Sequence, residues 1–405
     1  MASKVTFSNL TYAGEHFLET FGPTVLDPAG LIDNDLAIAL DQTKFKMTLN
    51  ELDDTVELQD PSAKFNDQSS TPDIDEVNVE AVPYEVHREL AWDNIRKSWL
   101  NNQLRPGSLE DYSPEQVTED FITNVYMPKF VQAQSNLILK GKNGLDPTIG
   151  SYSFGQSYNG LYELFDTSNV VRKLAITQDQ ITVASVGSAA DPTVLVAAGN
   201  FTNTLYPGNY VSIRNAAGTG WSALNTDIRI LAVEKSGSDT NITLDIDTSG
   251  LTDTNYTADS AVIRFINRTN IISKMAAHLG FVPDQVRRNG AKIVLPTHLE
   301  MEWQFANAEA QQNGGGYYLT SHQLQMINQQ VVILDNAREN TIGTWPKNRV
   351  GFSFDLNNDA TNMELTWLGQ STGDKVYHLR AASKTGIQIS TLFGNEITLT
   401  TPEKD

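Results

Sequence analysis

The sequence predicts an α+β fold that carries a separate all-β segment. A long amphipathic pattern from Ser113 to Gly141 predicts a helix. Short β-type runs at even spacing between residues 171 and 268 predict a small barrel or sandwich. Helix, strand and helix patterns then precede a β-rich end. A chain of 405 residues has room for roughly two or three hydrophobic cores. The predicted parts are 1–41, 42–90, 91–170, 171–268 and 269–405.

The first part, residues 1–41, consists of short apolar clusters broken by turn-forming pairs such as Gly-Pro and Asp-Pro. A helical piece between Glu15 and Phe21 is compatible with the pattern, but no compact domain is. This composition predicts an N-terminal arm that leans on another surface, either the body of this molecule or a neighbouring one.

The second part, residues 42–90, predicts two strands joined by a long polar tip. Alternation from Lys44 puts Phe45, Met47 and Leu49 on one face of a strand, and strand patterning resumes at Val77. A two-stranded arm is marginally stable alone and needs a partner surface. The alternative is a disordered surface loop between ordinary strands. Residues 51–80 of this part are strongly acidic, because they carry one lysine, Lys64, and many carboxylates. The carboxylates are Glu51, Asp53, Asp54, Glu57, Asp60, Asp67, Asp73, Asp75, Glu76 and Glu80.

Two helices are predicted in residues 91–170. The segment from Leu90 to Leu100 has the spacing of a short amphipathic helix. A longer helix follows from Ser113, with Ser113 as its N-cap and Gln116 at the capping-box position. If continuous, it would be about 40 Å long. We expect a bend at Pro128, because proline removes one backbone hydrogen bond.

The remaining elements follow the same two periodicities. Between residues 171 and 268, β-type runs such as TVLVAA and NITLDID are separated by glycine-rich turns. NIISKMAAHLGF then predicts a helix and AKIVLP a buried strand. Residues 297–312 predict a helix capped by Thr297, with Glu300 at the capping-box position. The last segments, from QVVILD to GIQISTLFGNEITL, are β-rich.

Composition limits the function. The chain has 29 Lys+Arg against 49 Asp+Glu and a formal net charge of −20, which disfavours tight binding to nucleic acid or anionic lipid. It does not prevent contact with DNA whose charge other cations neutralise. Without cysteine, disulfides and thiolate-bound metals are excluded. No signal peptide or membrane-spanning run is visible, so we expect a soluble protein made in a cytoplasm.

The sequence predicts no catalytic, cofactor-binding or metal-binding residues. The triplets Asp166–Ser168 and Asp247–Ser249 have Ser where aspartic proteases need Gly, and turns explain them better. Gly155–Asn159 lacks the last glycine of a nucleophile elbow. Asp355–Thr366 lacks the glycine and glutamate of a calcium loop. The histidines are not paired at metal-ligand spacing: His16, His87, His278, His298, His322 and His378.

The order of these segments resembles that of the major capsid proteins of tailed double-stranded DNA bacteriophages, which have the Hong Kong 97-type fold. By this resemblance, Thr43–Val86 is the extended loop and Ser113–Lys140 the spine helix, which ends in LILKGKNG. AKIVLPTHLEMEWQFANAE is similar to a strand–helix passage of the family, QVVILDNARENTIGTWPKNRVGFSFD to its axial-domain passage, and KVYHLRAASKTGIQISTLFGNEITL to its closing strands. The insertion at 171–268 departs from many relatives.

The resemblance implies a head protein that assembles into hexamers and pentamers of an icosahedral shell around phage DNA. Its expected partners are further copies of itself, a portal protein and possible separate scaffolding or decoration proteins, with no membrane partner. Its expected location is the virion, after assembly in the bacterial cytoplasm. Because only some 40 residues precede the extended loop, no fused scaffolding segment is expected. The inserted domain is expected to project from the outside of the shell.

Three other interpretations remain open. Low charge density and Asn/Thr-rich β segments also suit a secreted adhesin or surface-layer protein, which would carry a secretion signal. An encapsulin-like shell would share the fold but usually has a shorter chain. A carbohydrate-acting enzyme would need paired carboxylates in a recognisable setting.

Overall fold

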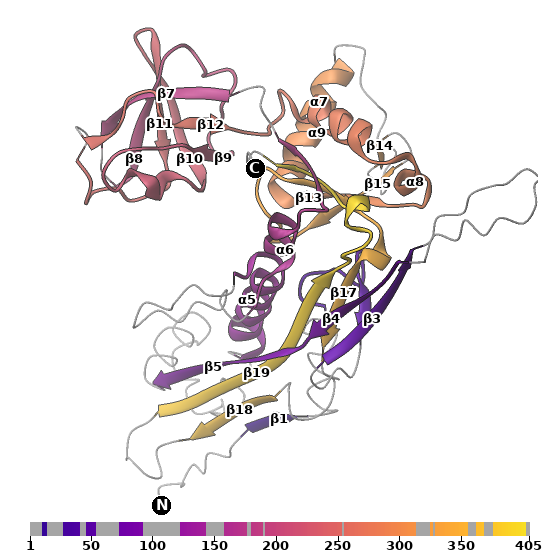
Figure 1. The fold of residues 1–405 in the computed structure, drawn as a ribbon. Coiled ribbons are helices and arrows are strands. Elements are labelled where there is room, and N and C mark those ends of the chain that lie inside the picture. Colours follow the sequence, from indigo (N-terminus) through magenta and orange to yellow (C-terminus); the bar gives the residue numbers. More distant parts are fainter. Residues whose placement is uncertain are drawn as a thin grey trace, which may run out of the picture. The chain divides into compact units, whose positions relative to one another are not determined.

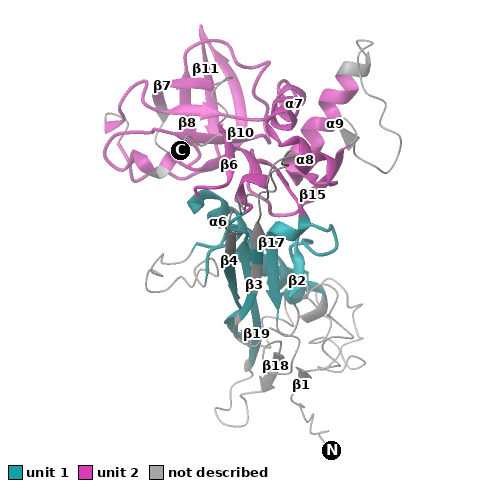
Figure 2. Cartoon of the chain, turned by 45° about the vertical axis from the view of Figure 1, so that its right-hand side comes forward, with its two compact units in different colours: residues 1–168, 347–392 teal, residues 169–346, 393–405 magenta. Residues whose placement is uncertain are grey.

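The computed structural model (Figure 1) describes residues 10–13, 27–40, 46–53, 73–91, 122–142, 158–175, 180–188, 191–252, 255–312, 325–326, 329–354, 362–367 and 376–401. The chain divides into two compact units (Figure 2). Unit 1 contains residues 1–168 and 347–392, and unit 2 contains residues 169–346 and 393–405.

Unit 1 is built around one long strand, β19, which runs from Val376 to Ile389. Strands β18, β17 and β5 all pair with it in antiparallel fashion, β1 extends the sheet beyond β18, and β2 pairs with β17 in parallel. Apolar side chains such as Phe352 and Leu379 are fully buried in this sheet. The other strands are β1 (Leu10–Ala13), β2 (Ile38–Leu40), β5 (Val82–Ala91), β17 (Val350–Phe354) and β18 (Asn362–Trp367).

Residues 27–40 of the predicted arm fold onto unit 1 itself. Leu31 and Leu36 are fully buried. The Asp27 carboxylate accepts the backbone N–H groups of Leu31, Ile32 and Asp33, each at 2.8 Å. The sequence was compatible with packing of this arm on its own chain or on a neighbouring molecule. Residues 27–40 pack on their own chain.

The long predicted helix changes geometry next to Pro128. A π-helical turn (Ile122–Tyr126) leads into α5 (Met127–Lys140), and Pro128 lies in the first turn of α5, where its missing N–H needs no acceptor. The predicted N-cap, Ser113, lies outside the described residues. Leu137, Ile138 and Leu139 are fully buried at the end of α5.

Two glycines hold α5 close to α6 (Leu161–Thr167). The Gly160 N–H donates to the Gly141 carbonyl at 2.7 Å. A Cβ atom on Gly141 would lie 2.5 Å from the Leu137 carbonyl oxygen, and one on Gly160 would lie 2.5 Å from the Gly141 nitrogen. Both positions therefore exclude a side chain, and the glycines fix this crossing.

Two strands of unit 1 form the predicted ribbon. Strand β3 (Lys46–Asp53) pairs with β4 (Asp73–Glu80) in antiparallel register along their whole length. The pairing of these two strands is confirmed. The predicted helix start at Leu90 is wrong, because β5 continues through Ala91 and pairs with β19 there. The rest of that predicted helix lies outside the described residues.

Unit 2 contains a closed barrel in the order β10-β11-β8-β7-β12-β9, with β9 pairing back to β10. Inward and outward side chains alternate along β8 and β11, as expected for strands with one face on a core. Trp221 is among the fully buried residues that fill it. The strands are β7 (Gln180–Ser188), β8 (Thr193–Ala197), β9 (Tyr210–Arg214), β10 (Asp227–Ser236), β11 (Asp239–Leu244) and β12 (Val262–Arg264), with a 3-10 turn at Trp221–Leu224.

The rest of unit 2 is a six-stranded mixed sheet in the order β14-β15-β13-β16-β20-β6, with α7 and α9 packed on it. Strand β6 pairs with β20 in this sheet, so the barrel strands themselves run from 180 to 264. The elements are β6 (Arg172–Ala175), α7 (Ile271–Phe281), α8 (Asp284–Arg288), β13 (Lys292–Pro296), α9 (Thr297–Gln312), β14 (Gln325–Met326), β15 (Gln329–Leu334), β16 (Ile342–Trp345) and β20 (Thr398–Thr401). The 3-10 turns are Lys347–Arg349 in unit 1 and Gly394–Glu396 in unit 2.

Candidate assembly surfaces

The β3–β4 ribbon is covered on only part of its apolar face. Strand β4 packs against β19 and β17, and its Val77 and Val79 are buried. Met47 of β3 lies directly opposite Val79 in the register and so shares its face, yet 41% of Met47 is exposed. Unit 1 therefore leaves an apolar side chain of β3 open to solvent.

Acidic side chains anchor this ribbon to the turn after β19. Glu51 Oε2 accepts the backbone N–H groups of Thr391 and Leu392 at 3.2 and 3.0 Å, and the Thr391 hydroxyl donates to Asp75 at 2.5 Å. The Thr391 hydrogen bond, together with the Glu76 N–H, lowers the pKa of Asp75. Glu51 and Asp75 are directly opposite in the register, where like charges repel. The donors of the turn offset that repulsion.

A close backbone approach fixes the end of β4, where the chain passes into β5. A Cβ atom on Gly386 of β19 would lie 1.9 Å from the Glu80 carbonyl oxygen and 2.9 Å from Ser353 Oγ. Only glycine fits there without moving the backbone of β4. The base of the ribbon is thus held by main-chain contacts, while β3 is held mainly through its pairing with β4.

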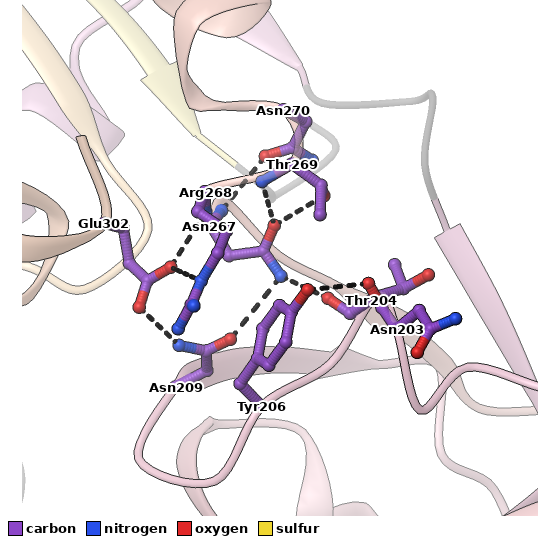
Figure 3. Close-up of polar contacts among 9 residues, drawn as sticks. All are labelled: Asn203, Thr204, Tyr206, Asn209, Asn267, Arg268, Thr269, Asn270 and Glu302. Carbon is purple, nitrogen blue, oxygen red and sulfur yellow. Dashed lines mark hydrogen bonds and ion pairs between the residues drawn. The ribbon is translucent and has the colours of Figure 1, made fainter. Parts of the chain in front are cut away.

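A second feature is the polar junction between the barrel and α9 (Figure 3). Glu302 of α9 is 7% exposed and accepts hydrogen bonds from Asn209 Nδ2 at 2.9 Å and from the Arg268 N–H at 2.8 Å. Arg268 Nε lies 3.3 Å from the same carboxylate. Asn267 is fully buried and donates from Nδ2 to the Thr204 carbonyl. Buried carboxylates need such partners, and Glu302 has them.

Asn340 makes a second set of contacts with the barrel. It is fully buried, and its Nδ2 donates to the Tyr210 carbonyl at 3.1 Å and to Ser212 Oγ at 3.3 Å. Its Oδ1 accepts the Ile266 N–H at 3.1 Å. Ser212 in turn donates to Asp227, whose pKa is raised by burial despite this bond. Two separate polar contacts therefore hold the barrel to the rest of unit 2.

Of the residues that the sequence singled out, those that the structure describes lie in several parts of the fold. Asp166 and Asp247 lie in different units, and Asp247 accepts the Ser249 N–H in a turn. His278 is fully buried and bonds Thr400 and Thr344 through its two ring nitrogens. His16, His322, Gly155–Ser157 and Asp355–Thr361 lie outside the described residues.

The described residues contain no group of three or more His, Asp or Glu side chains placed to hold a metal ion. None of the helices in the described ranges is both long enough and apolar enough to cross a membrane.

The Glu302 junction was not predicted from the sequence. The run Asn267–Asn270 is the available signal, because four consecutive polar residues separate a strand from an apolar helix start. Its partners Asn209 and Glu302 are far away in the chain, so local patterns do not connect them.

No family model and no curated protein matches the chain. Solved structures do match. The satellite phage P4 procapsid including size determination (Sid) protein has a TM-score of 0.47 and 8% identity, covering 100% of this chain and 94% of that chain. The capsid of an empty GTA particle has a TM-score of 0.43 and 10% identity, with coverage of 92% and 89%. The cyanophage A-1(L) capsid has a TM-score of 0.41 and 8% identity, with coverage of 100% and 97%. The chain is thus similar to phage and GTA capsid structures.

Proposed function

We propose that this chain is the major capsid protein of a tailed phage and self-assembles into hexamers and pentamers of an icosahedral shell around double-stranded DNA. Its role is structural and not enzymatic. Further copies of the chain are its main partners, with a portal protein and separate scaffolding or decoration proteins as others. DNA would lie near the shell without sequence-specific contact. Assembly would take place in the bacterial cytoplasm, and the virion would be the final location.

The observation that carries this proposal is the incomplete cover of the β3–β4 ribbon. An isolated two-stranded ribbon is marginal in water, and this one is anchored at its base while Met47 stays 41% exposed. Full burial of such a side chain contributes about 1.5–3 kcal/mol, so covering the exposed 41% of Met47 would contribute roughly 1 kcal/mol. A neighbouring copy of the chain supplies the missing surface in this proposal, so the ribbon becomes an assembly element.

The order of segments supports the same function. The ribbon, the helix α5, a barrel within a mixed α/β unit and the closing strand β19 follow one another as the resemblance in the sequence implies. We assign the extended-loop role to β3–β4 and the spine-helix role to the segment that includes α5. In this proposal the barrel faces the outside of the shell.

Electron microscopy and sedimentation velocity of the purified protein test the proposal. Wild-type protein should form closed shells or rings of five and six copies. Met47→Glu should reduce the amount assembled at least tenfold, because a charge on β3 cannot be buried against a neighbour. Leu231→Glu is the matched control, since Leu231 of the barrel strand β10 is 42% exposed and should tolerate the charge. Wild-type protein that stays monomeric at every concentration would contradict the proposed function.

A further inference from the structure

The outer face of α9 carries the most exposed large apolar side chain among the described residues. Met301 is 58% exposed and Phe305, one turn later on the same face, is 45% exposed. The opposite face of the helix, with Leu299 and Trp303, is buried in the core of unit 2. The outer face is therefore an apolar surface that the described part of the chain leaves open.

This surface continues from α9 onto the barrel side of unit 2. The Arg268 guanidinium lies 4.9 Å from the centre of the Phe305 ring and 3.9 Å from that of Tyr206. Met, Phe, Tyr and Arg are the residue types enriched at the centres of protein interfaces. Glu302 already balances the charge of Arg268. Glu309 is exposed one further turn along this face, so a carboxylate lies beside the apolar side chains.

A surface of complementary character lies in the other half of the same sheet. Strand β6 is an edge strand and pairs with β20, whereas α9 packs over β13 and β15. Next to β6, Val170 is 43% exposed. The Arg172 guanidinium lies 4.7 Å from the centre of the Phe281 ring. Lys173 follows it on the strand, so this edge combines apolar side chains with positive charge.

We infer that the outer face of α9 in one copy docks onto the β6 edge of the next copy, with Met301 and Phe305 against Val170 and Phe281. Glu309 and Arg172 would then meet at the rim. The two surfaces lie in different halves of one sheet, so the contact is head-to-tail. A head-to-tail contact produces a ring when its rotation closes. This inference rests on the proposed function and names the surface by which unit 2 takes part in capsomer formation.

Charge reversal at the rim tests the pairing. Glu309→Lys and Arg172→Glu should each raise the protein concentration needed for ring formation about tenfold, which corresponds to about 1.4 kcal/mol. The double variant Glu309→Lys/Arg172→Glu should restore most of the loss, because the charges are complementary again. Sedimentation velocity measures the assembled fraction, and circular dichroism confirms that each variant is folded.

A charge in the apolar centre provides a second test. Met301→Glu should abolish rings without lowering the melting temperature, because Met301 is already exposed, and Leu231→Glu is again the control. If wild-type protein assembles and both Met301→Glu and the charge reversals assemble equally well, this inference is wrong and the proposed function stands. If wild-type protein forms no rings, both are wrong.

Discussion

The junction around Glu302 makes a quantitative prediction. Replacing Glu302 with Ala removes the acceptor of three donors: Asn209 Nδ2, the Arg268 N–H and Arg268 Nε. Asn209 is only 5% exposed, so water cannot readily replace the lost oxygen. Each buried donor without an acceptor costs about 1–3 kcal/mol. Two such donors, the Asn209 amide and the Arg268 N–H, give a total of about 4 kcal/mol for the local structure.

Hydrogen exchange measures this loss where it occurs. The Arg268 N–H is bonded to Glu302, so its exchange rate reports the opening of the junction directly. A loss of about 4 kcal/mol should speed its exchange by two to three orders of magnitude in Glu302→Ala, since each 1.4 kcal/mol is a factor of ten. Glu302→Gln should speed the exchange less than Glu302→Ala, because the amide keeps one of the two accepting oxygens.

The control lies on the same helix. Glu300 is half-buried and accepts a bond from the Gln304 side chain at 3.2 Å. Its replacement by Ala should change the exchange of the Arg268 N–H less than threefold. If Glu302→Ala leaves that exchange within threefold of wild type, the junction does not hold the barrel to α9 as described.

Three further predictions concern single positions. Gly386→Ala should destabilise unit 1 by several kcal/mol in thermal unfolding, because its Cβ would lie 1.9 Å from a carbonyl oxygen of β4. Gly280→Ala is the control and should be neutral or stabilising, because a Cβ there has nothing within 4 Å. Equal effects of the two substitutions would contradict the close approach at Gly386. Burial lowers the pKa of His278 from 6.5 to about 3. Below pH 6.5 the imidazole is therefore protonated in the unfolded chain but stays neutral in the folded chain. Stability should therefore fall by about 2 kcal/mol between pH 7.5 and pH 5, and His278→Gln should lose that part of the pH dependence. Gln134→Leu should change the free energy of unfolding by less than about 1 kcal/mol. The substitution removes the hydrogen bond from Gln134 to the Tyr84 hydroxyl, but it also removes the buried Oε1, which has no partner among the described residues. A loss above about 3 kcal/mol would show that Oε1 has a partner.

Local periodicity predicted those elements whose packing agrees with it. The helix α7, the passage from β13 into α9 and the pairing of β3 with β4 are all confirmed. In α7 the apolar spacing of 3.6 matches the buried face, and in β4 the spacing of 2 matches the buried Val77 and Val79. The Thr297 hydroxyl at the start of α9 is shown donating to Asp335, a residue of a following turn. Such a tertiary partner is invisible in a capping pattern.

Partners distant in the chain could not be predicted in this way. Leu90 and Ala91 have helical spacing with the residues after them, but in the structure they pair with β19 as part of the sheet. Strand β6 has the same local texture as the barrel strands, yet it pairs with β20 near the end of the chain. Glu302 looks like any polar residue of an amphipathic helix until Arg268 and Asn209 are placed beside it. Pairing across long sequence separations is decided by the whole fold and not by the segment.

A cryo-electron microscopy structure of assembled wild-type particles would show whether neighbouring copies cover the β3–β4 ribbon. We expect shells of five- and six-membered rings in which Met47 is buried against a neighbouring chain. Particles in which Met47 remains exposed and the ribbon contacts no other copy would contradict it.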